Sequence, residues 1–239
     1  MSSWRLRRFA AGLLPLPAAP DNLVVCYVTD RKSLGPGSSA SVPSVLEKIR
    51  AAAQAGVDWI QIREKDLPAH ELLALAREAV SIVRSSAGKA RVIVNDRLDV
   101  ALAADAAGVH LGGESAPARE VVHWCRAGNA PTGFRIGVSC HNVQETHEAE
   151  DAGADYALFG PIYDTPSKRS YGAPQGIAGL KEVCGAARIT VIAIGGVNEE
   201  NAAECIRAGA AGIAAIRMFQ EAKSTQALAD AVALIHRLI

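Results

Sequence analysis

An amide and two cations occupy alternate positions in the short stretch WIQIREKD. Side chains on a β-strand alternate between its two faces, so Gln61, Arg63 and Lys65 are expected on one face. Long cations on an enclosed face are costly unless an opposite charge pairs with them. An anion with several oxygens suits this set, because arginine offers a planar fork, lysine a point charge and glutamine an amide. The stretch therefore predicts an anion site, with an internal ion pair to Glu64 or Asp96 as the alternative.

A second candidate anion site lies where the stretch ITVIAIGG ends in Gly195 and Gly196. The exposed backbone N–H groups of two glycines can approach a phosphate closely. Arg217, directly after the stretch GIAAI, would add a positive charge. Glycine pairs are frequent in turns, so the place of this pair at a strand end is what favours a phosphate site.

Asn95 and Asp96 follow another apolar stretch, RVIV. They offer oxygen ligands for Mg²⁺, which prefers one or two carboxylates together with substrate phosphates. The same residues also suit the start of the following helix, where Asp96 or Asp99 could serve as the N-cap. Both roles stay open at this stage.

The remaining apolar stretches also end in groups that can bind phosphate, bind metal or move a proton. These are Thr29, Asp30, His110, Ser139, His141, Thr165, Ser167 and Lys168. His110 could pair with His141 on a metal, or it could be an ordinary buried histidine. Any one of these groups could be a solvated loop residue, but their regular recurrence favours a shared site.

A repeated pattern indicates which elements position these residues. An alanine-rich helical stretch, a glycine and a short apolar strand recur around Gly56, Gly108, Gly153 and Gly209. A glycine after a helix predicts a C-cap, because the left-handed conformation costs glycine little. Each interval is about 50 residues, which suits two strand–helix units.

Eight short strands alternating with helices indicate an α/β fold with a parallel sheet. Eight such units can close as a (β/α)8 TIM barrel, whose active site lies at the C-terminal ends of the strands. An open doubly wound sheet is the alternative, but no G-x-G-x-x-G follows the first strand. We expect a single catalytic domain over residues 23–239. Residues 1–22 are expected to be a disordered tail, with an export signal as the less favoured alternative, since prolines interrupt their apolar run.

Composition narrows the class of protein. The 239 residues carry a formal net charge of +0, so no general attraction to nucleic acid or membrane is expected. The sequence contains no apolar run of about 18 residues. Five scattered cysteines predict reduced thiols, mostly in the core of a cytoplasmic protein. Small phosphorylated molecules are the expected partners, and the oligomeric state is open, with a homodimer as one candidate.

The chain resembles the thiamine phosphate synthase and thiazole tautomerase family from about Tyr27 to Phe219. The stretches that carry the resemblance are QIREKD, VNDRLDVAL, GVHLG, IGVSCH, GADYALFGPIYDTPSK and IAIGGV, in the order of the family. The resemblance implies a transferase, a thiamine-phosphate diphosphorylase. Such an enzyme couples hydroxymethylpyrimidine diphosphate with thiazole phosphate, with Mg²⁺ helping the diphosphate to leave.

The resemblance also implies roles for individual residues. The diphosphate substrate would contact Gln61, Arg63, Lys65 and Asn95, and Thr165 and Ser167 match the substrate-binding hydroxyl positions that precede Lys168. Asp96 would ligate Mg²⁺, and Lys168 would neutralise the leaving group. Gly196 would bind the thiazole phosphate through its backbone. His141 matches the proton-transfer histidine of the tautomerase.

Two positions depart from the synthase pattern. Ser115 stands where synthases usually carry a second acidic metal ligand, with Glu114 beside it, and Arg217 stands where they typically have serine. Both changes leave room for the tautomerase, or for a non-catalytic ligand-binding barrel. Retention of Gln61, Arg63, Lys65, Asp96 and Lys168 favours the synthase, because a protein without diphosphate chemistry would have little use for them.

Overall fold

The computed structural model describes residues 23–34, 41–86, 88–165 and 173–238. The predicted tail 1–22 lies outside these ranges, as do Ser167 and Lys168. The strands are β1 Val24–Val28, β2 Trp59–Ile62, β3 Arg91–Asn95, β4 Gly108–Leu111, β5 Arg135–Cys140, β6 Tyr156–Phe159, β7 Thr190–Ile194 and β8 Gly212–Ala215. The helices are α1 Val42–Gln54, α2 Ala69–Ser85, α3 Leu98–Ala103, α4 Ala118–Trp124, α5 Val143–Ala152, α6 Gly176–Ala186, α7 Ala202–Arg207, α8 Arg217–Gln220 and α9 Thr225–His236.

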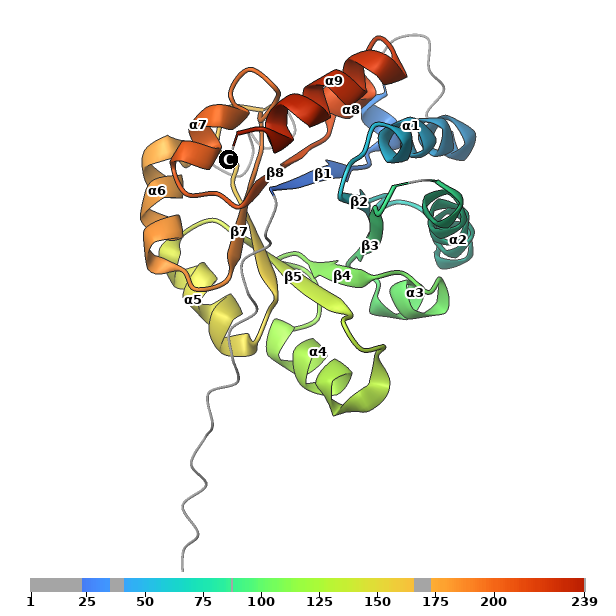
Figure 1. The fold of residues 1–239 in the computed structure, drawn as a ribbon. Coiled ribbons are helices and arrows are strands. Elements are labelled where there is room, and N and C mark those ends of the chain that lie inside the picture. The colour runs from blue at the N-terminus through green and yellow to red at the C-terminus, as the bar shows by residue number, and fades with distance from the viewer. Residues whose placement is uncertain (1–22, 35–40, 87, 166–172, 239) are drawn as a thin grey trace, which may run out of the picture.

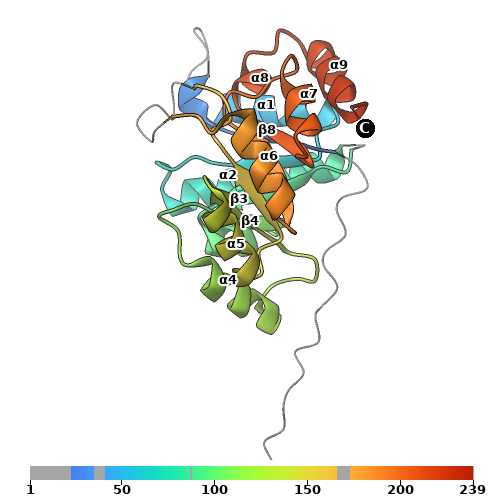
Figure 2. The same ribbon diagram turned by 90° about the vertical axis from the view of Figure 1, so that its left-hand side faces the viewer.

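The strands form a closed parallel barrel in the order β1 to β8. Closure is made by β8 beside β1, with Val24 opposite Gly212 and Tyr27 opposite Ala215. Helices surround the strands on the outside (Figure 1), and α6, at the left of that view, faces the viewer in Figure 2. The predicted (β/α)8 barrel is thereby confirmed over the open sheet. None of the helices in the described ranges is both long and apolar enough to cross a membrane.

Alternation along each strand divides the apolar residues between two cores. In β1, Val25 and Tyr27 pack outward beneath the helices, in the large cluster that also contains Phe219. Val24 and Val28 point into the barrel, where they pack with residues of β2, β6, β7 and β8. Because the inner residues fill the barrel itself, polar groups have space only at its mouth.

The repeated glycines were predicted to be C-caps, and the prediction is wrong for one of them. Gly153 ends α5 in the left-handed conformation, with φ of 85°. Gly56 and Gly209 also have positive φ, each just after a helix. Gly108 instead begins β4, and a Cβ there would overlap the carbonyl of Arg135 on β5. Close approach of two strands, not helix termination, therefore requires the glycine at that position.

The cysteines have the character that the sequence predicts. All five are free, and Cys184 is the one that is not fully buried. Burial raises the pKa of the Cys140 thiol to about 12. Thiols are reactive mainly as thiolates, so these side chains behave as apolar packing groups at neutral pH.

Candidate active site

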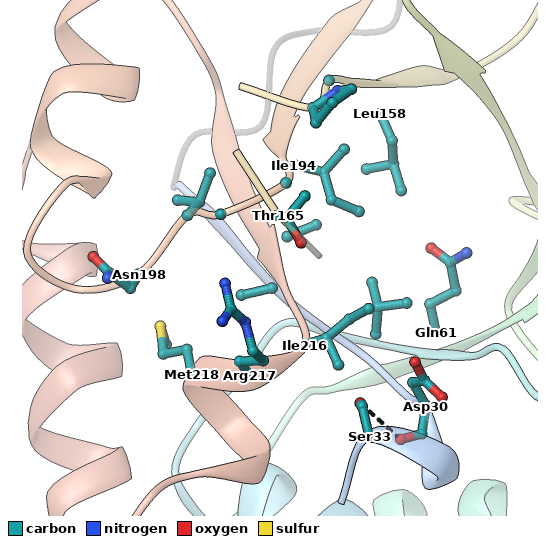
Figure 3. Close-up of a pocket in the computed structure, with 18 of the residues that line it drawn as sticks. Asp30, Ser33, Gln61, Leu158, Thr165, Ile194, Asn198, Ile216, Arg217 and Met218 are labelled. Atoms are coloured by element: carbon teal, nitrogen blue, oxygen red, sulfur yellow. Dashed lines mark hydrogen bonds between the residues drawn. The ribbon is translucent and has the colours of Figure 1, made fainter. Parts of the chain in front are cut away.

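A cavity of about 610 Å³ opens at the C-terminal ends of the strands (Figure 3). It brings together nine of the residues that the sequence singled out for substrate binding or catalysis. These are Gln61, Arg63, Asn95, Ser139, His141, Thr165, Gly195, Gly196 and Arg217. Lys65 and Asp96 are not among the residues that line it. Since Ser167 and Lys168 fall outside the described ranges, nothing is assigned to them here.

The wall formed by β2 and β3 carries an amide pair and a cation. Gln61 is buried, and its Nε2 donates to Asn95 Oδ1 over 3.0 Å. The backbone N–H of Arg63 donates to Thr29 Oγ1 over 2.9 Å, which fixes the chain as it leaves the strand. The side chain of Arg63 forms no ion pair with any described residue. Its guanidinium is therefore available to a ligand in the cavity.

The predicted alternative, an internal ion pair between Arg63 and Glu64, does not form. Glu64 is buried and accepts hydrogen bonds from the backbone N–H of Arg31 at 3.1 Å. The Arg31 guanidinium also contacts Glu64, at 3.2 Å, and pairs with Asp66. These contacts satisfy the two carboxylates at the end of β2 from the β1 side, so they leave Arg63 without a counterion among the residues that the structure describes.

Lys65 does not share the inner face with Gln61 and Arg63 as predicted. Strand β2 ends at Ile62, and Lys65 lies in the turn that follows, with an exposed side chain. The period-two rule holds only while the chain remains extended. In this structure Lys65 stands outside the cavity wall, and it forms no ion pair with any residue in the described ranges.

Asp96 stands just beyond Asn95 at the end of β3, half-buried and with φ of 65°. The Ser115 hydroxyl donates to its carboxylate, and Ser115 Oγ accepts from the backbone N–H of Gly112 over 2.7 Å. The alternative role as an N-cap is not realised, because α3 begins after Arg97 and lacks a side-chain cap.

The donor set around Asp96 fits Mg²⁺ held jointly with a ligand. Within the described part of the chain, no group of three or more His, Cys, Asp or Glu side chains could hold an ion by itself. Glu114, the neighbouring acidic residue, is exposed. Mg²⁺ commonly takes one or two carboxylates and completes its shell with phosphate oxygens and water. Asp96 would supply the carboxylate.

The two histidines of the site take part in separate contacts. The His141 ring bonds through Nδ1 to the carbonyl of Gly160, and its backbone N–H donates to Glu145 Oε2 over 2.7 Å. His110 is buried, with Nε2 at 2.9 Å from Ser139 Oγ. Both ring nitrogens of His110 are engaged by protein groups, Nε2 by Ser139 and Nδ1 by Tyr156, so this ring is not arranged to share a metal with His141.

The opposite end of the cavity has the geometry of a phosphate cradle. Gly195 and Gly196 both have positive φ, and a Cβ on either would lie within 2.7 Å of Pro161 or Tyr163. Their N–H groups donate to no other residue in the described ranges, while Asn201 Nδ2 holds the Gly196 carbonyl at 3.0 Å. Only glycine fits at these two positions, and both residues line the cavity.

Arg217 completes this end of the cavity. It is the first residue of α8, and it forms no ion pair with any residue that the structure describes. Figure 3 shows its guanidinium extending away from α8 toward the space between Asn198 and Thr165. The cavity thus has cationic or N–H donors at two ends: Arg63 on the β2 side and Arg217 with the glycines on the β7–β8 side.

The sequence did not indicate part of the cavity wall, nor the packing of Tyr156 below the cavity. The wall continues over Ser33, Met218, Glu221 and Lys223, which occupy loops or short helices and have no distinctive spacing. Tyr156 on β6 was also missed, although a signal existed. A glycine inside a strand, Gly137, indicates that another group occupies the space of its side chain.

Comparisons of the sequence with known proteins point to one family. The sequence model of one protein family, described as thiamine monophosphate synthase, matches residues 26–219. The thiamine-phosphate synthase of Roseiflexus sp. is 39% identical over 202 residues, covering 84% of this chain and 80% of that protein. The corresponding synthase of Moorella thermoacetica is 41% identical over 190 residues, 80% of this chain and 85% of the other.

A solved structure extends the likeness to three dimensions. The thiamine phosphate pyrophosphorylase of Pyrococcus furiosus superposes with a TM-score of 0.77 at 31% identity. The alignment covers 91% of this chain and 97% of that one. The match therefore extends over most of both chains. The chain belongs to the thiamine monophosphate synthase family.

Proposed function

We propose that this protein is a thiamine-phosphate synthase, a transferase that joins hydroxymethylpyrimidine diphosphate to thiazole phosphate and releases diphosphate. One observation carries the proposal: a single cavity has anion-binding groups at two ends, with Arg63 and Arg217 both unpaired among the described residues. A reaction between two phosphorylated molecules requires such an arrangement. The synthases named among the relatives support the same activity.

The diphosphate end is assigned to the β2–β3 wall. Gln61 and Asn95 would orient the pyrimidine substrate, and Arg63 would bind diphosphate oxygens through its planar fork. Thr165, which lines the cavity, would add a hydroxyl group. Ser167 and Lys168 keep the roles that the family resemblance implies for them, and Lys65 would reach the diphosphate only from outside the cavity wall. Gly195, Gly196 and Arg217 would hold the thiazole phosphate at the other end.

The reaction breaks the C–O bond between the pyrimidine methylene and the diphosphate, and the electron pair leaves with the diphosphate. The lone pair of the thiazole nitrogen then forms the new C–N bond. Negative charge grows on the leaving group, so cations that are already in position stabilise the transition state more than the ground state. Arg63 would supply this stabilisation, and bound Mg²⁺ would neutralise part of the same charge.

Asp96 is the proposed metal ligand, and its replacement by asparagine tests this role. Loss of one negative charge from the ligand set should raise the Mg²⁺ concentration for half-maximal activity about tenfold. The measurement is a titration of initial rate against Mg²⁺. Asp99→Asn is the matched control, because Asp99 pairs with Arg97 on the surface. An equal Mg²⁺ requirement in Asp96→Asn and the control would remove Asp96 from the metal site.

The function itself is tested by incubating the protein with pyrimidine diphosphate, thiazole phosphate and Mg²⁺ and measuring thiamine phosphate. A parallel incubation with the thiazole carboxylate tautomer alone tests the tautomerase, which would use His141 for proton transfer. Formation of thiamine phosphate supports the proposal. Isomerisation of the thiazole without coupling would replace it by the tautomerase.

A further inference from the structure

Three polar side chains from adjacent strands form a chain of contacts at the base of the cavity. His110 on β4 contacts Ser139 Oγ on β5 through Nε2 at 2.9 Å. Its Nδ1 lies 3.3 Å from the hydroxyl oxygen of Tyr156 on β6. His110 and Ser139 line the cavity, whereas Tyr156 belongs to the inner core below it. The contacts therefore connect the barrel interior to the substrate space.

The fold makes room for this arrangement at Gly137. His110, Gly137 and Tyr156 are register partners across three neighbouring strands. A Cβ on Gly137 would overlap the ring of Tyr156, so that ring occupies the space over β5 and approaches His110. Trp59 packs against the same ring, with centroids 4.7 Å apart. Packing thus fixes the hydroxyl of Tyr156 beside the imidazole.

The direction of the hydrogen bonds follows from the phenol proton. Burial raises the pKa of Tyr156 well above its ordinary value, so the hydroxyl keeps its proton. Tyr156 is 1% exposed, and His110 is the one hydrogen-bond partner of its oxygen in the described ranges. A buried donor without an acceptor is costly, so Tyr156 donates and Nδ1 accepts.

This direction decides where the imidazole proton lies. A neutral imidazole has one donor and one acceptor, and a charged one has two donors. Since Nδ1 accepts from the Tyr156 hydroxyl, the ring proton lies on Nε2. The Nε2–H group then donates to Ser139 Oγ, and the hydroxyl proton of Ser139 is left for another acceptor.

We propose that His110 is a positioning residue that, held by Tyr156, makes the Ser139 hydroxyl a hydrogen-bond donor to an anionic oxygen in the cavity. His110 is in register with Asn95, which pairs with Gln61, so Ser139 belongs to the end of the cavity assigned to the diphosphate. The identity of this ligand rests on the proposed function, whereas the position of the proton on His110 follows from the contacts with Tyr156 and Ser139 alone.

The arrangement is tested first in the unchanged protein. Nitrogen-15 NMR of the histidine rings reports which nitrogen of His110 carries the proton. We expect the proton on Nε2 and none on Nδ1. A proton on Nδ1, or on both nitrogens, would overturn the proposal without any substitution.

Calorimetry with inorganic diphosphate and Mg²⁺ tests whether the Ser139 hydroxyl donates to an anionic ligand. Tyr156→Phe keeps the ring but removes the hydroxyl that donates to Nδ1, so the imidazole is no longer held in this tautomer and Ser139 can donate to it instead. The dissociation constant should rise about tenfold, as expected for a lost hydrogen bond to a charged group. Ser139→Ala should give a similar rise. The double variant should bind no more weakly than either single variant, because both remove the same interaction.

Tyr27→Phe is the matched control. Tyr27 is buried on the outer face of β1 against Phe219, with ring centroids 4.9 Å apart, and it does not line the cavity. Its replacement should leave both diphosphate affinity and the His110 proton unchanged. The proposed role of His110 would be overturned if the losses of diphosphate affinity in the double variant were additive, or if Tyr156→Phe kept full affinity. A protein that shows this coupling but forms no thiamine phosphate would refute the proposed function alone.

Discussion

Replacement of Arg63 by alanine is expected to lower kcat/KM for thiamine phosphate formation about a hundredfold. Arg63 is half-buried at the cavity wall and forms no ion pair with any described residue. A neighbouring carboxylate would have neutralised it, but Glu64 is engaged by Arg31. The positive charge is therefore available to the leaving diphosphate, where charge grows in the transition state. Steady-state rates with varied pyrimidine diphosphate measure the effect.

Two further variants separate the effect of the Arg63 charge from that of its planar shape, and the two ends of the cavity from each other. Arg63→Lys keeps the charge but loses the planar fork, so it should recover only part of the rate. Arg217→Ala removes a cation from the other end of the cavity. It should raise KM for thiazole phosphate and leave KM for the pyrimidine diphosphate close to its original value. A loss of only a few-fold in Arg63→Ala, or equal effects on both substrates, would contradict the proposed division of the cavity.

The barrel and the location of its site were predictable because both depend on local patterns. Strand alternation and helical stretches repeat along the chain, and the C-terminal ends of parallel strands must meet at one mouth. Gln61 lies within β2 and Arg63 just after it, so the period-two rule placed both correctly. The rule failed at Lys65 because the strand ends at Ile62, and strand ends are poorly determined by sequence alone.

Pairing between distant segments could not be predicted in the same way. Arg31 satisfies Glu64 from the loop after β1, and Ser115 donates to Asp96 from the loop after β4. Nothing in the spacing of these residues indicates the contacts, because the closed barrel brings the loops together. The open alternatives for Arg63 and Asp96 were therefore decided by tertiary structure. Lys168 remains a prediction.

Glycine illustrates the same difference between local and tertiary causes. Gly153 caps a helix, which a local rule predicts. Gly108 and Gly137 lie in strands and are required by neighbours that are distant in sequence, Arg135 for the first and Tyr156 for the second. The sequence shows that such a glycine is unusual in a strand, but only the register shows which group fills its space.

Replacement of Gly137 by alanine is expected to lower the free energy of unfolding by about 3 kcal/mol. The new methyl group would overlap the Tyr156 ring, which is 1% exposed and packed against Trp59 at 4.7 Å. The ring cannot move aside within this enclosed layer, so it must leave its position and open a cavity. Urea unfolding followed by fluorescence or circular dichroism measures the change.

Gly113→Ala is the matched control for this substitution. A Cβ on Gly113 would meet no atom within 4 Å, and the residue is exposed, so its replacement should change stability by less than about 0.5 kcal/mol. Tyr156→Leu in the Gly137→Ala background removes the overlapping ring. The double variant should lose less stability than the two single variants together, by at least about 1 kcal/mol, because the residues compete for one space. If Gly137→Ala is as mild as the control, the Tyr156 ring does not occupy this space, and His110 loses the packing that holds its partner in place.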